Sequence, residues 1–271
     1  MTSGWTSGET GGSISGERVS SAEGGFNPTF QRHVSAYRLC ASLLPDGRVL
    51  DLGCGTGHSY RELAPRETVG VDIEPRALAG QQRETHAADM RALPFADGTF
   101  QAVLSVQSIE HVPDPERVLS EVVRVLAPSG RAIFVTPNRL TFGRPDEIID
   151  PYHYLEYDAQ QLLALCAPAF AAVDVRGLFG SPRYLALVQT ERRELDRLLA
   201  RDPLRVRRLV PRRVRQRLYD HRLRSSRAVA LPGAEEIGPE DFTLAAAPLQ
   251  TALDLIAICD LGGATVRSEH A

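Results

Sequence analysis

The 271-residue sequence contains no lysine, because all 31 of its basic residues are arginine. No Schiff-base lysine, phosphate-loop lysine or lysine general base can therefore exist in the chain. This excludes covalent amine catalysis and Walker-type nucleotide hydrolysis. Aromatic residues are also scarce, at 6%, whereas hydrophobic residues make up 43% and charged residues 24%. This length and balance predict one sizeable globular domain.

Paired cysteines and long apolar runs are missing as well. The four cysteines lie far apart and form no C-x-x-C pair, which suggests neither a zinc site nor a disulfide framework. No apolar run approaches the roughly 20 residues of a membrane span. The N-terminus shows no basic region followed by an apolar one. We therefore expect a cytoplasmic protein.

The formal net charge of -3 hides two regions of opposite charge. Between Arg192 and Arg227 there are 14 Arg and 4 acidic residues, a local charge of +10 that leaves -13 for the remainder. The pattern of this segment predicts amphipathic helices broken at Pro203 and Pro211. The segment is either a solvated face or a surface for an anionic acceptor, a nucleic acid or an anionic membrane.

Short β-rich apolar runs alternate with helical patterns along most of the chain. Residues 1–27 have few apolar side chains and are expected to form a disordered tail. Strands are predicted at 48–52, 68–72, 85–88, 100–106, 131–136, 170–175 and 253–259, and helices at 30–43, from His58, at 115–126 and at 158–166. This order predicts an α/β fold with a doubly wound sheet of seven strands.

A glycine-rich loop follows the first predicted strand. Residues 49–52 lead directly into Gly53-Cys54-Gly55-Thr56-Gly57. Glycines allow a tight turn and a close ligand, and in an open α/β sheet such a loop lies at the carboxyl ends of the strands, where ligands bind. The next strand ends at Asp72, about 20 residues later, where a carboxylate can accept both hydroxyls of a ribose. The alternative for Asp72 is a helix cap before Pro75.

Four ordered motifs resemble the class I S-adenosylmethionine-dependent methyltransferases. They are D-L-G-C-G-T-G at 51–57, V-G-V-D-I at 69–73, A-D-M-R-A-L-P-F at 88–95, and F-Q-A-V-L-S before E-H-V at 110–112. The resemblance implies a Rossmann-like fold whose last strand is antiparallel, and S-adenosyl-L-methionine as cofactor. Residues 28–180 would form the cofactor-binding core, 181–240 an Arg-rich helical insertion or lid, and 241–271 the final strand and the C-terminal tail.

The resemblance also implies which residues bind the cofactor. The methionine part would contact Asp51, Gly53, Cys54 and Gly55, and Asp72 would hold the ribose. The adenine would contact Ile73, Asp89 and Met90, and the backbone around Val106 and Gln107 would close the other side of the site. Asp89 would accept the adenine amino group, and its alternative is a turn residue. A sulfonium needs no phosphate cradle, only orientation for in-line attack.

The segment after residue 106 resembles the ubiquinone-biosynthesis O-methyltransferases. Residues 107–115 read Q-S-I-E-H-V-P-D-P where those enzymes have E-x-x-E-H-V-P-D-P, in which both glutamates and the histidine can hold a divalent cation. Gln107 replaces the first glutamate, and losing an anionic ligand should weaken a hard cation site. We therefore predict methyl transfer without a metal. His111 is either a general base or a structural histidine.

The connection at 138–157 holds an unusual density of aromatic and titratable residues. Long ordered loops of this kind are commonly functional. Within it, His153 is the first choice for the base that takes a proton from a hydroxyl. The alternative is a loop histidine bonded to the backbone.

These observations predict methyl transfer to a hydroxyl of a small-molecule or glycosylated acceptor. One alternative is an RNA or other polyanion methyltransferase that uses the Arg-rich segment. The N/D-P-P-Y/F motif of amino-methylating nucleic-acid enzymes is absent at 107–110, so nucleic acid is not the expected partner. A further alternative is a protein that binds the cofactor without catalysis.

Overall fold

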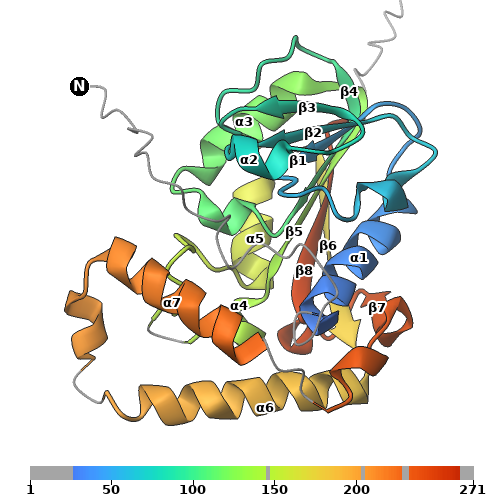
Figure 1. The fold of residues 1–271 in the computed structure, drawn as a ribbon. Coiled ribbons are helices and arrows are strands. Elements are labelled where there is room, and N and C mark those ends of the chain that lie inside the picture. Colours follow the sequence, from blue (N-terminus) through green and yellow to red (C-terminus); the bar gives the residue numbers. More distant parts are fainter. Residues whose placement is uncertain (1–26, 145–146, 203–204, 228–231, 263–271) are drawn as a thin grey trace, which may run out of the picture.

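An eight-stranded sheet organises the chain (Figure 1). The computed structural model describes residues 27–144, 147–202, 205–227 and 232–262, so the predicted tail lies outside the described residues except for Asn27. The strand order is β3-β2-β1-β4-β5-β8-β6-β7. The strands are β1 (Val49–Leu52), β2 (Thr68–Asp72), β3 (Glu84–Ala87), β4 (Phe100–Val106), β5 (Leu126–Pro137), β6 (Ala172–Gly180), β7 (Phe242–Ala245) and β8 (Asp254–Asp260).

The strand directions confirm the doubly wound prediction. Strands β1 to β5 pair in parallel, whereas β8 pairs antiparallel with both β5 and β6. The last strand is thus antiparallel, as predicted, and β6 runs parallel to β5. The predicted number of seven strands is one too low, because β7 adds an antiparallel edge strand next to β6. Its four residues are too few to show an alternating pattern in the sequence.

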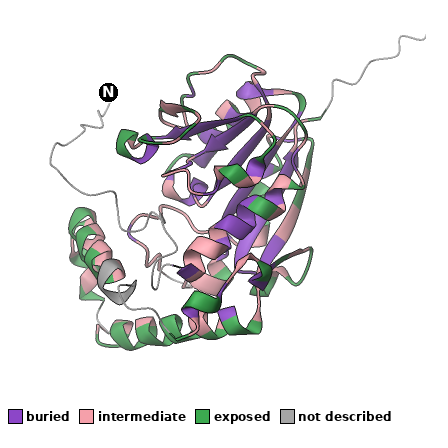
Figure 2. Ribbon diagram, turned by 45° about the vertical axis from the view of Figure 1, so that its right-hand side comes forward, coloured by how far each residue is buried: buried purple, intermediate pink, exposed green. Residues whose placement is uncertain are grey.

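Helices cover both faces of the sheet. They are α1 (Asn27–Ala41), α2 (Pro75–Leu78), α3 (Pro115–Val125), α4 (Arg139–Phe142), α5 (Ala159–Cys166), α6 (Pro182–Leu199) and α7 (Arg212–Arg227). Side chains of α3 and α5, such as Val118 and Leu162, lie in one buried cluster with the sheet. Side chains of α1 and α6, such as Tyr37 and Tyr184, lie in the second cluster. The strands between them are mostly buried (Figure 2).

Short 3-10 helices make up several connections. They are η2 (Tyr60–Leu63), η3 (Ile109–His111), η4 (Val206–Leu209), η5 (Ala234–Glu236), η6 (Pro239–Asp241) and η7 (Leu249–Thr251). The helix predicted from His58 is wrong in length, because only η2 forms there. Leu63 is fully buried and Pro65 follows it. Proline has no amide hydrogen and cannot continue the helix.

The Arg-rich segment forms α6, η4 and α7, whose described residues are mostly exposed or half-buried (Figure 2). The start of α6 packs on the sheet through Tyr184, whereas η4 and α7 stand away from the sheet (Figure 1). Helix α7 begins directly after Pro211, as predicted, whereas Pro203 lies outside the described residues. Arg192 of α6 donates to the carbonyl of Thr141 (2.6 Å), which holds α6 against the segment that follows β5. Across the described part of the chain, each helix is too short or too polar to cross a membrane.

Candidate cofactor and acceptor site

The glycine loop after β1 lies against the segment that follows β4. Gly53, Gly55 and Gly57 have φ angles of 75°, 53° and 69°, a region that glycine enters without strain. A Cβ atom on Gly53 would stand 2.5 Å from Cβ of Ser108. Ser108 also donates a hydrogen bond to the carbonyl of Leu52 (3.2 Å). Glycine is therefore required at position 53 by packing as well as by backbone conformation.

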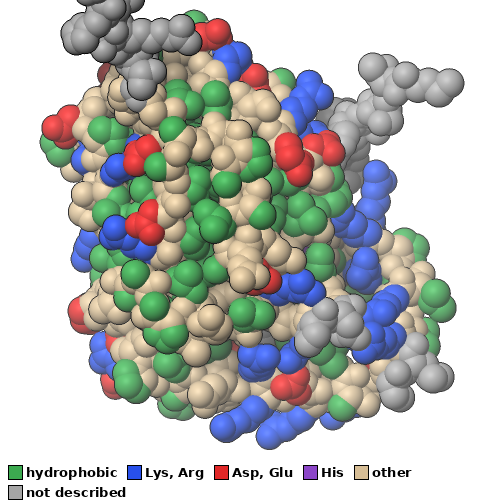
Figure 3. Space-filling view, turned by 180° about the vertical axis from the view of Figure 1, so that it is seen from behind, with side chains coloured by type: hydrophobic (Ala, Val, Ile, Leu, Met, Phe, Trp, Pro, Cys, Tyr) green, Lys and Arg blue, Asp and Glu red, His purple; other side chains and the backbone are tan. Residues whose placement is uncertain are grey.

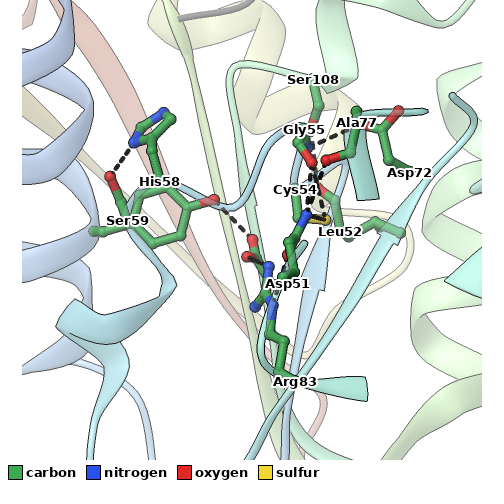
Figure 4. Close-up of polar contacts among 12 residues, drawn as sticks. Asp51, Leu52, Cys54, Gly55, His58, Ser59, Asp72, Ala77, Arg83 and Ser108 are labelled. Carbon is green, nitrogen blue, oxygen red and sulfur yellow. Dashed lines mark hydrogen bonds and ion pairs between the residues drawn. The ribbon is translucent and has the colours of Figure 1, made fainter. Parts of the chain in front are cut away.

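Asp72, at the end of β2, is bonded to this loop (Figure 4). Its Oδ2 accepts a hydrogen bond from the amide of Gly55 (2.9 Å), and its Oδ1 accepts one from the amide of Glu74 (2.9 Å). The side chain that caps α2 is that of Glu74, so the alternative role for Asp72 as the helix cap is not what the structure shows. Ile73, the next residue, is 55% exposed and offers an apolar surface beside the loop.

Asp51 takes part in a buried ion pair that the sequence did not indicate. Its Oδ2 lies 2.7 Å from Nη2 of Arg83, and its Oδ1 accepts a hydrogen bond from the hydroxyl of Tyr37 (2.7 Å). The side chains of Asp51 and Arg83 are 0% and 4% exposed. The Arg83 guanidinium also lies 4.3 Å from the centre of the Tyr60 ring. Both oxygens of this predicted cofactor ligand are thus already held by protein groups (Figure 4).

Cys54 is buried within the loop. Burial raises the pKa of its thiol to about 12, so the side chain is a neutral packing group. Gln81 donates to the carbonyl of Gly55 (2.9 Å) and lies 3.8 Å from the Cys54 sulfur. Gln81 therefore supports the loop from the connection between α2 and β3, a role that the sequence analysis missed.

Met90 and Asp89 follow β3 on the other side of the loop. The terminal methyl of Met90 would lie 3.3 Å from a Cβ on Gly53, so the two residues are close neighbours. The side chain of Arg91 binds both oxygens of Asp89 at 2.7 to 3.2 Å and holds the pKa of that carboxyl below its usual value. Asp89 also accepts the Arg91 amide (2.9 Å), as a turn residue would.

Val106 ends β4 and Gln107 follows it, the two residues predicted to close the other side of the cofactor site. Gln107 has a φ of 52°, a conformation that is uncommon for residues other than glycine. Its side-chain amide donates to Oδ1 of Asp254 at the start of β8 (3.0 Å). Asp254 is buried and lies 3.5 Å from Nε of Arg32 of α1. The side chain that replaces the first glutamate of the resembled motif is therefore bonded to β8.

A cluster of titratable side chains lies where β4 and β5 end. Glu110 is fully buried and accepts a hydrogen bond from the Thr136 hydroxyl (3.0 Å), while its Oε1 has no hydrogen-bond partner among the described residues. The rings of His111 and His153 are 5.0 Å apart, centre to centre. One atom from each of Glu110, His111 and His153 lies within 4.8 Å of the others. The structure thus brings together both histidines that the sequence analysis singled out.

Helix α7 holds the segment that carries His153. The Tyr219 hydroxyl donates to Asp150 (2.7 Å), and the Tyr152 hydroxyl donates to Asp220 of α7 (2.7 Å). Each of these two bonds joins α7 to a residue within three positions of His153. The insertion therefore borders the predicted acceptor site.

Arginines of the insertion extend this contact. Arg212 donates to the carbonyls of Pro151 (2.7 Å) and Tyr152 (3.0 Å), and its guanidinium lies 3.7 Å from the centre of the Tyr154 ring. Arg207 forms an ion pair with Glu147 at 2.5 Å. The inward-facing arginines of the insertion are therefore structural.

Comparison with known proteins decides which family these features belong to. Residues 50–134 match a family described as a methyltransferase domain. A protein of Mycolicibacterium smegmatis, named as a probable S-adenosylmethionine-dependent methyltransferase, is 33% identical over 176 residues, which cover 61% of this chain and 68% of that protein. The chain belongs to the S-adenosylmethionine-dependent methyltransferase family.

Other relatives of this methyltransferase differ in how much of the chain they match. A protein of Mycobacterium tuberculosis with the same kind of name is 36% identical over 167 residues, and the match covers 58% of this chain and 61% of that protein. The tocopherol O-methyltransferase of Arabidopsis thaliana is 38% identical over 119 residues, which cover 39% of this chain and 34% of that enzyme. A Thermotoga maritima methyltransferase structure has 19% identity, a TM-score of 0.60, and coverage of 87% and 92%. This last likeness shows the shared fold.

The residues of the loop fit the family's cofactor, S-adenosylmethionine. The hydroxyl of Thr56 and Nη1 of Arg83 are buried and have no hydrogen-bond partner within the described ranges. A ligand with polar groups at its methionine end would give such atoms partners. Gly53 leaves no room for a side chain, and the exposed Ile73 and the nearby Met90 supply apolar surface for a flat ring. The hydrogen-bonding groups and the shape of this site therefore both fit S-adenosylmethionine.

Proposed function

We propose that the protein transfers the methyl group of S-adenosylmethionine to a hydroxyl oxygen of a small-molecule acceptor. The cofactor supplies an electrophilic methyl group on a sulfonium. The observation that carries the proposal is the cluster of Glu110, His111 and His153. Glu110 follows Ser108 by two residues, and Ser108 packs on Gly53 of the glycine loop, so the cluster lies close to the expected cofactor site. When a hydroxyl oxygen takes up the methyl group it must lose its proton, so a proton acceptor is needed beside the cofactor. The name of the tocopherol O-methyltransferase relative supports an acceptor with a hydroxyl group.

The two histidines differ in electrostatic surroundings. Burial alone would lower the pKa of His153, but the hydrogen bond with Glu156 and the charges of Asp150 and Glu110 raise it to about 9. Glu156 lies 3.2 Å and Asp150 3.9 Å from the ring. Burial raises the pKa of Glu110 to about 7, which the charge of His153 partly offsets. At neutral pH, His153 is therefore protonated and cannot accept a further proton.

We assign proton transfer to His111 for this reason. Its Nδ1 lies 3.3 Å from the carbonyl oxygen of Tyr152. Because a carbonyl oxygen can only accept, Nδ1 carries the hydrogen, and Nε2 carries the lone pair in the neutral ring. The positive charge of the His153 imidazolium would stabilise the negative charge that develops on the acceptor oxygen as it loses its proton. We interpret the cluster as a proton-transfer site rather than a metal site, because Gln107 replaces a carboxylate and a protonated imidazole offers no lone pair.

The pH dependence of the methyl-transfer rate tests the role of His153. We expect kcat/KM to fall as the pH rises through about 9, because His153 then loses its proton. His153→Gln should lose this alkaline limb, and His111→Ala should lower the rate by about 100-fold or more. His86→Gln, at a half-exposed position on β3, is the matched control and should keep the wild-type profile. A wild-type profile for His153→Gln would remove His153 from the mechanism.

The same shift makes a prediction for stability. The pKa of His153 in the folded protein lies above its ordinary value of 6.5, so protonation favours the folded state. This contribution is complete below about pH 6.5 and is lost as the pH rises through about 9. The difference in melting temperature between wild type and His153→Gln should shrink over that range. An unchanged difference would contradict the assigned pKa.

Transfer of isotopic label tests the proposed reaction itself. The purified chain is incubated with methyl-labelled S-adenosylmethionine and with separated water-soluble and lipid extracts, and products are analysed by mass spectrometry. A labelled O-methyl product is expected in one of the small-molecule fractions. Label in added RNA instead, or cofactor binding by calorimetry without any labelled product, would contradict the proposal.

A further inference from the structure

The outward face of the Arg-rich insertion carries exposed apolar side chains among its arginines. Val206 and Leu209 of η4 are 54% and 83% exposed, and Val214 and Leu218 of α7 are 45% and 63% exposed. Residues three apart on a 3-10 helix and four apart on an α-helix lie on the same side. Each element therefore presents its own apolar pair to the outside. We call these four residues the apolar row.

The contacts of α7 settle which way it faces. Tyr219 and Asp220 bond to the segment at 150–152, and Arg212 and Gln216 donate to carbonyls of the same segment. Among the residues of α7 up to Leu223, the exposed ones are Arg213, Val214, Arg217, Leu218, His221 and Arg222. At 100° per residue they fill the opposite half of the helix, with Val214 and Leu218 between arginines on both sides. The outward face of α7 thus carries both apolar and charged side chains, and none of them is used in the contacts with residues 150–152.

The charge of this face is strongly positive. Of the eight Arg from Arg205 to Arg222, three are exposed on the outer side of α7, namely Arg213, Arg217 and Arg222. The one acidic residue of this stretch, Asp220, points inward to Tyr152. Within the described residues, Arg213, Arg217 and Arg222 form no ion pair. Seen from behind, Arg side chains gather with hydrophobic ones on the side of the molecule where α7 lies (Figure 3). An anionic partner is the complement of such a surface.

We propose that this face docks the protein on an anionic lipid bilayer. Arginines would bind the headgroups while the apolar row enters the boundary between headgroups and acyl chains, as in interfacial amphipathic helices. A nucleic acid would match the arginines but would leave Val206, Leu209, Val214 and Leu218 in water. The face also lacks the Phe, Tyr or Trp side chains on which bases stack, because Tyr219 bonds to Asp150. The inference goes beyond the proposed reaction, and its test does not depend on turnover.

Flotation with vesicles tests the proposal on the full chain. Vesicles of phosphatidylcholine alone are compared with vesicles that contain phosphatidylcholine and phosphatidylglycerol. We expect binding to the anionic vesicles only, and weaker binding as salt is added. Arg213→Gln with Arg217→Gln should lower the partition coefficient by about 30-fold, because each arginine near an anionic surface contributes about fivefold. Leu209→Ser with Leu218→Ser should lower it by a similar factor or more.

A matched control pair is Arg61→Gln with Arg117→Gln, which removes the same charge from exposed positions outside the insertion. This pair should bind vesicles within about threefold of wild type, and melting curves should show that every variant is folded. Absence of wild-type binding to anionic vesicles would overturn the proposal. So would unchanged binding by Leu209→Ser with Leu218→Ser, or displacement of the protein from vesicles by a single-stranded RNA that it binds more tightly.

Discussion

Replacement of Arg83 by Met is expected to lower the free energy of unfolding by about 3–5 kcal/mol, because it leaves the Asp51 carboxylate buried without its cation. The Arg83–Asp51 pair is 2.7 Å long, and both side chains are almost inaccessible to solvent. The hydroxyl of Tyr37 also contacts Asp51, but it offers only a single hydrogen bond. Urea denaturation followed by circular dichroism measures the loss.

Two further variants make this result specific. Arg38→Met removes one partner of an exposed pair with Glu62 and should cost less than about 1 kcal/mol. Arg83→Met combined with Asp51→Asn removes the unpaired charge and should recover part of the lost stability. A loss for Arg83→Met no larger than that for Arg38→Met would show that the Asp51 carboxylate finds solvent in solution.

Asp72→Ala is expected to weaken the binding of S-adenosylmethionine by about 100-fold. The carboxylate accepts the amides of Gly55 and Glu74 and so holds the glycine loop. It is also the group that we expect to accept the ribose hydroxyls. Hydrogen bonds to a charged group contribute about 1.5–3 kcal/mol each, and 1.4 kcal/mol corresponds to a tenfold change in affinity. Isothermal calorimetry with S-adenosylhomocysteine measures the change without turnover.

The control for Asp72→Ala is Asp97→Ala, because Asp97 is highly exposed and belongs to the turn before β4. Its affinity should stay within about twofold of wild type. Urea denaturation of both variants separates a loss of binding from a loss of fold. Asp72→Ala that binds the cofactor as well as wild type would exclude Asp72 as the ribose ligand.

Local patterns were sufficient for most of the sheet. Strands β2 and β4 span the predicted residues, because runs of five to seven mostly apolar residues record burial directly. Strand β3 lies one residue before its predicted position, although its residues are mostly polar and are exposed or half-buried. Helix α5 begins after Asp158, whose side chain forms a capping box with Gln161. Such signals lie within four residues of the feature they specify. They place the glycine loop and Asp72 side by side once a parallel sheet is assumed.

Contacts between distant segments were not visible in the sequence. Arg83 reaches Asp51 only because β3 pairs with β2 and β2 pairs with β1. The carboxylates of Asp150 and Glu156 surround His153 through the fold of one irregular segment, for which no periodic pattern exists. The sequence therefore identified His153 as a titratable residue of the site, but its charge at neutral pH depends on these neighbours. That dependence changes the role that we propose for it.

Helix α7 has one face toward the His153 segment, bonded through Tyr219 and Arg212, and one face with Leu218 exposed. If binding on the outer face changes the position of α7, it changes the affinity of the inner site for its acceptor. By thermodynamic linkage, an acceptor analogue must then change the affinity for vesicles by the same factor. If α7 does not respond to binding, the coupling factor is one, so the ratio of vesicle affinities with and without the analogue measures the coupling free energy between the two faces of the helix.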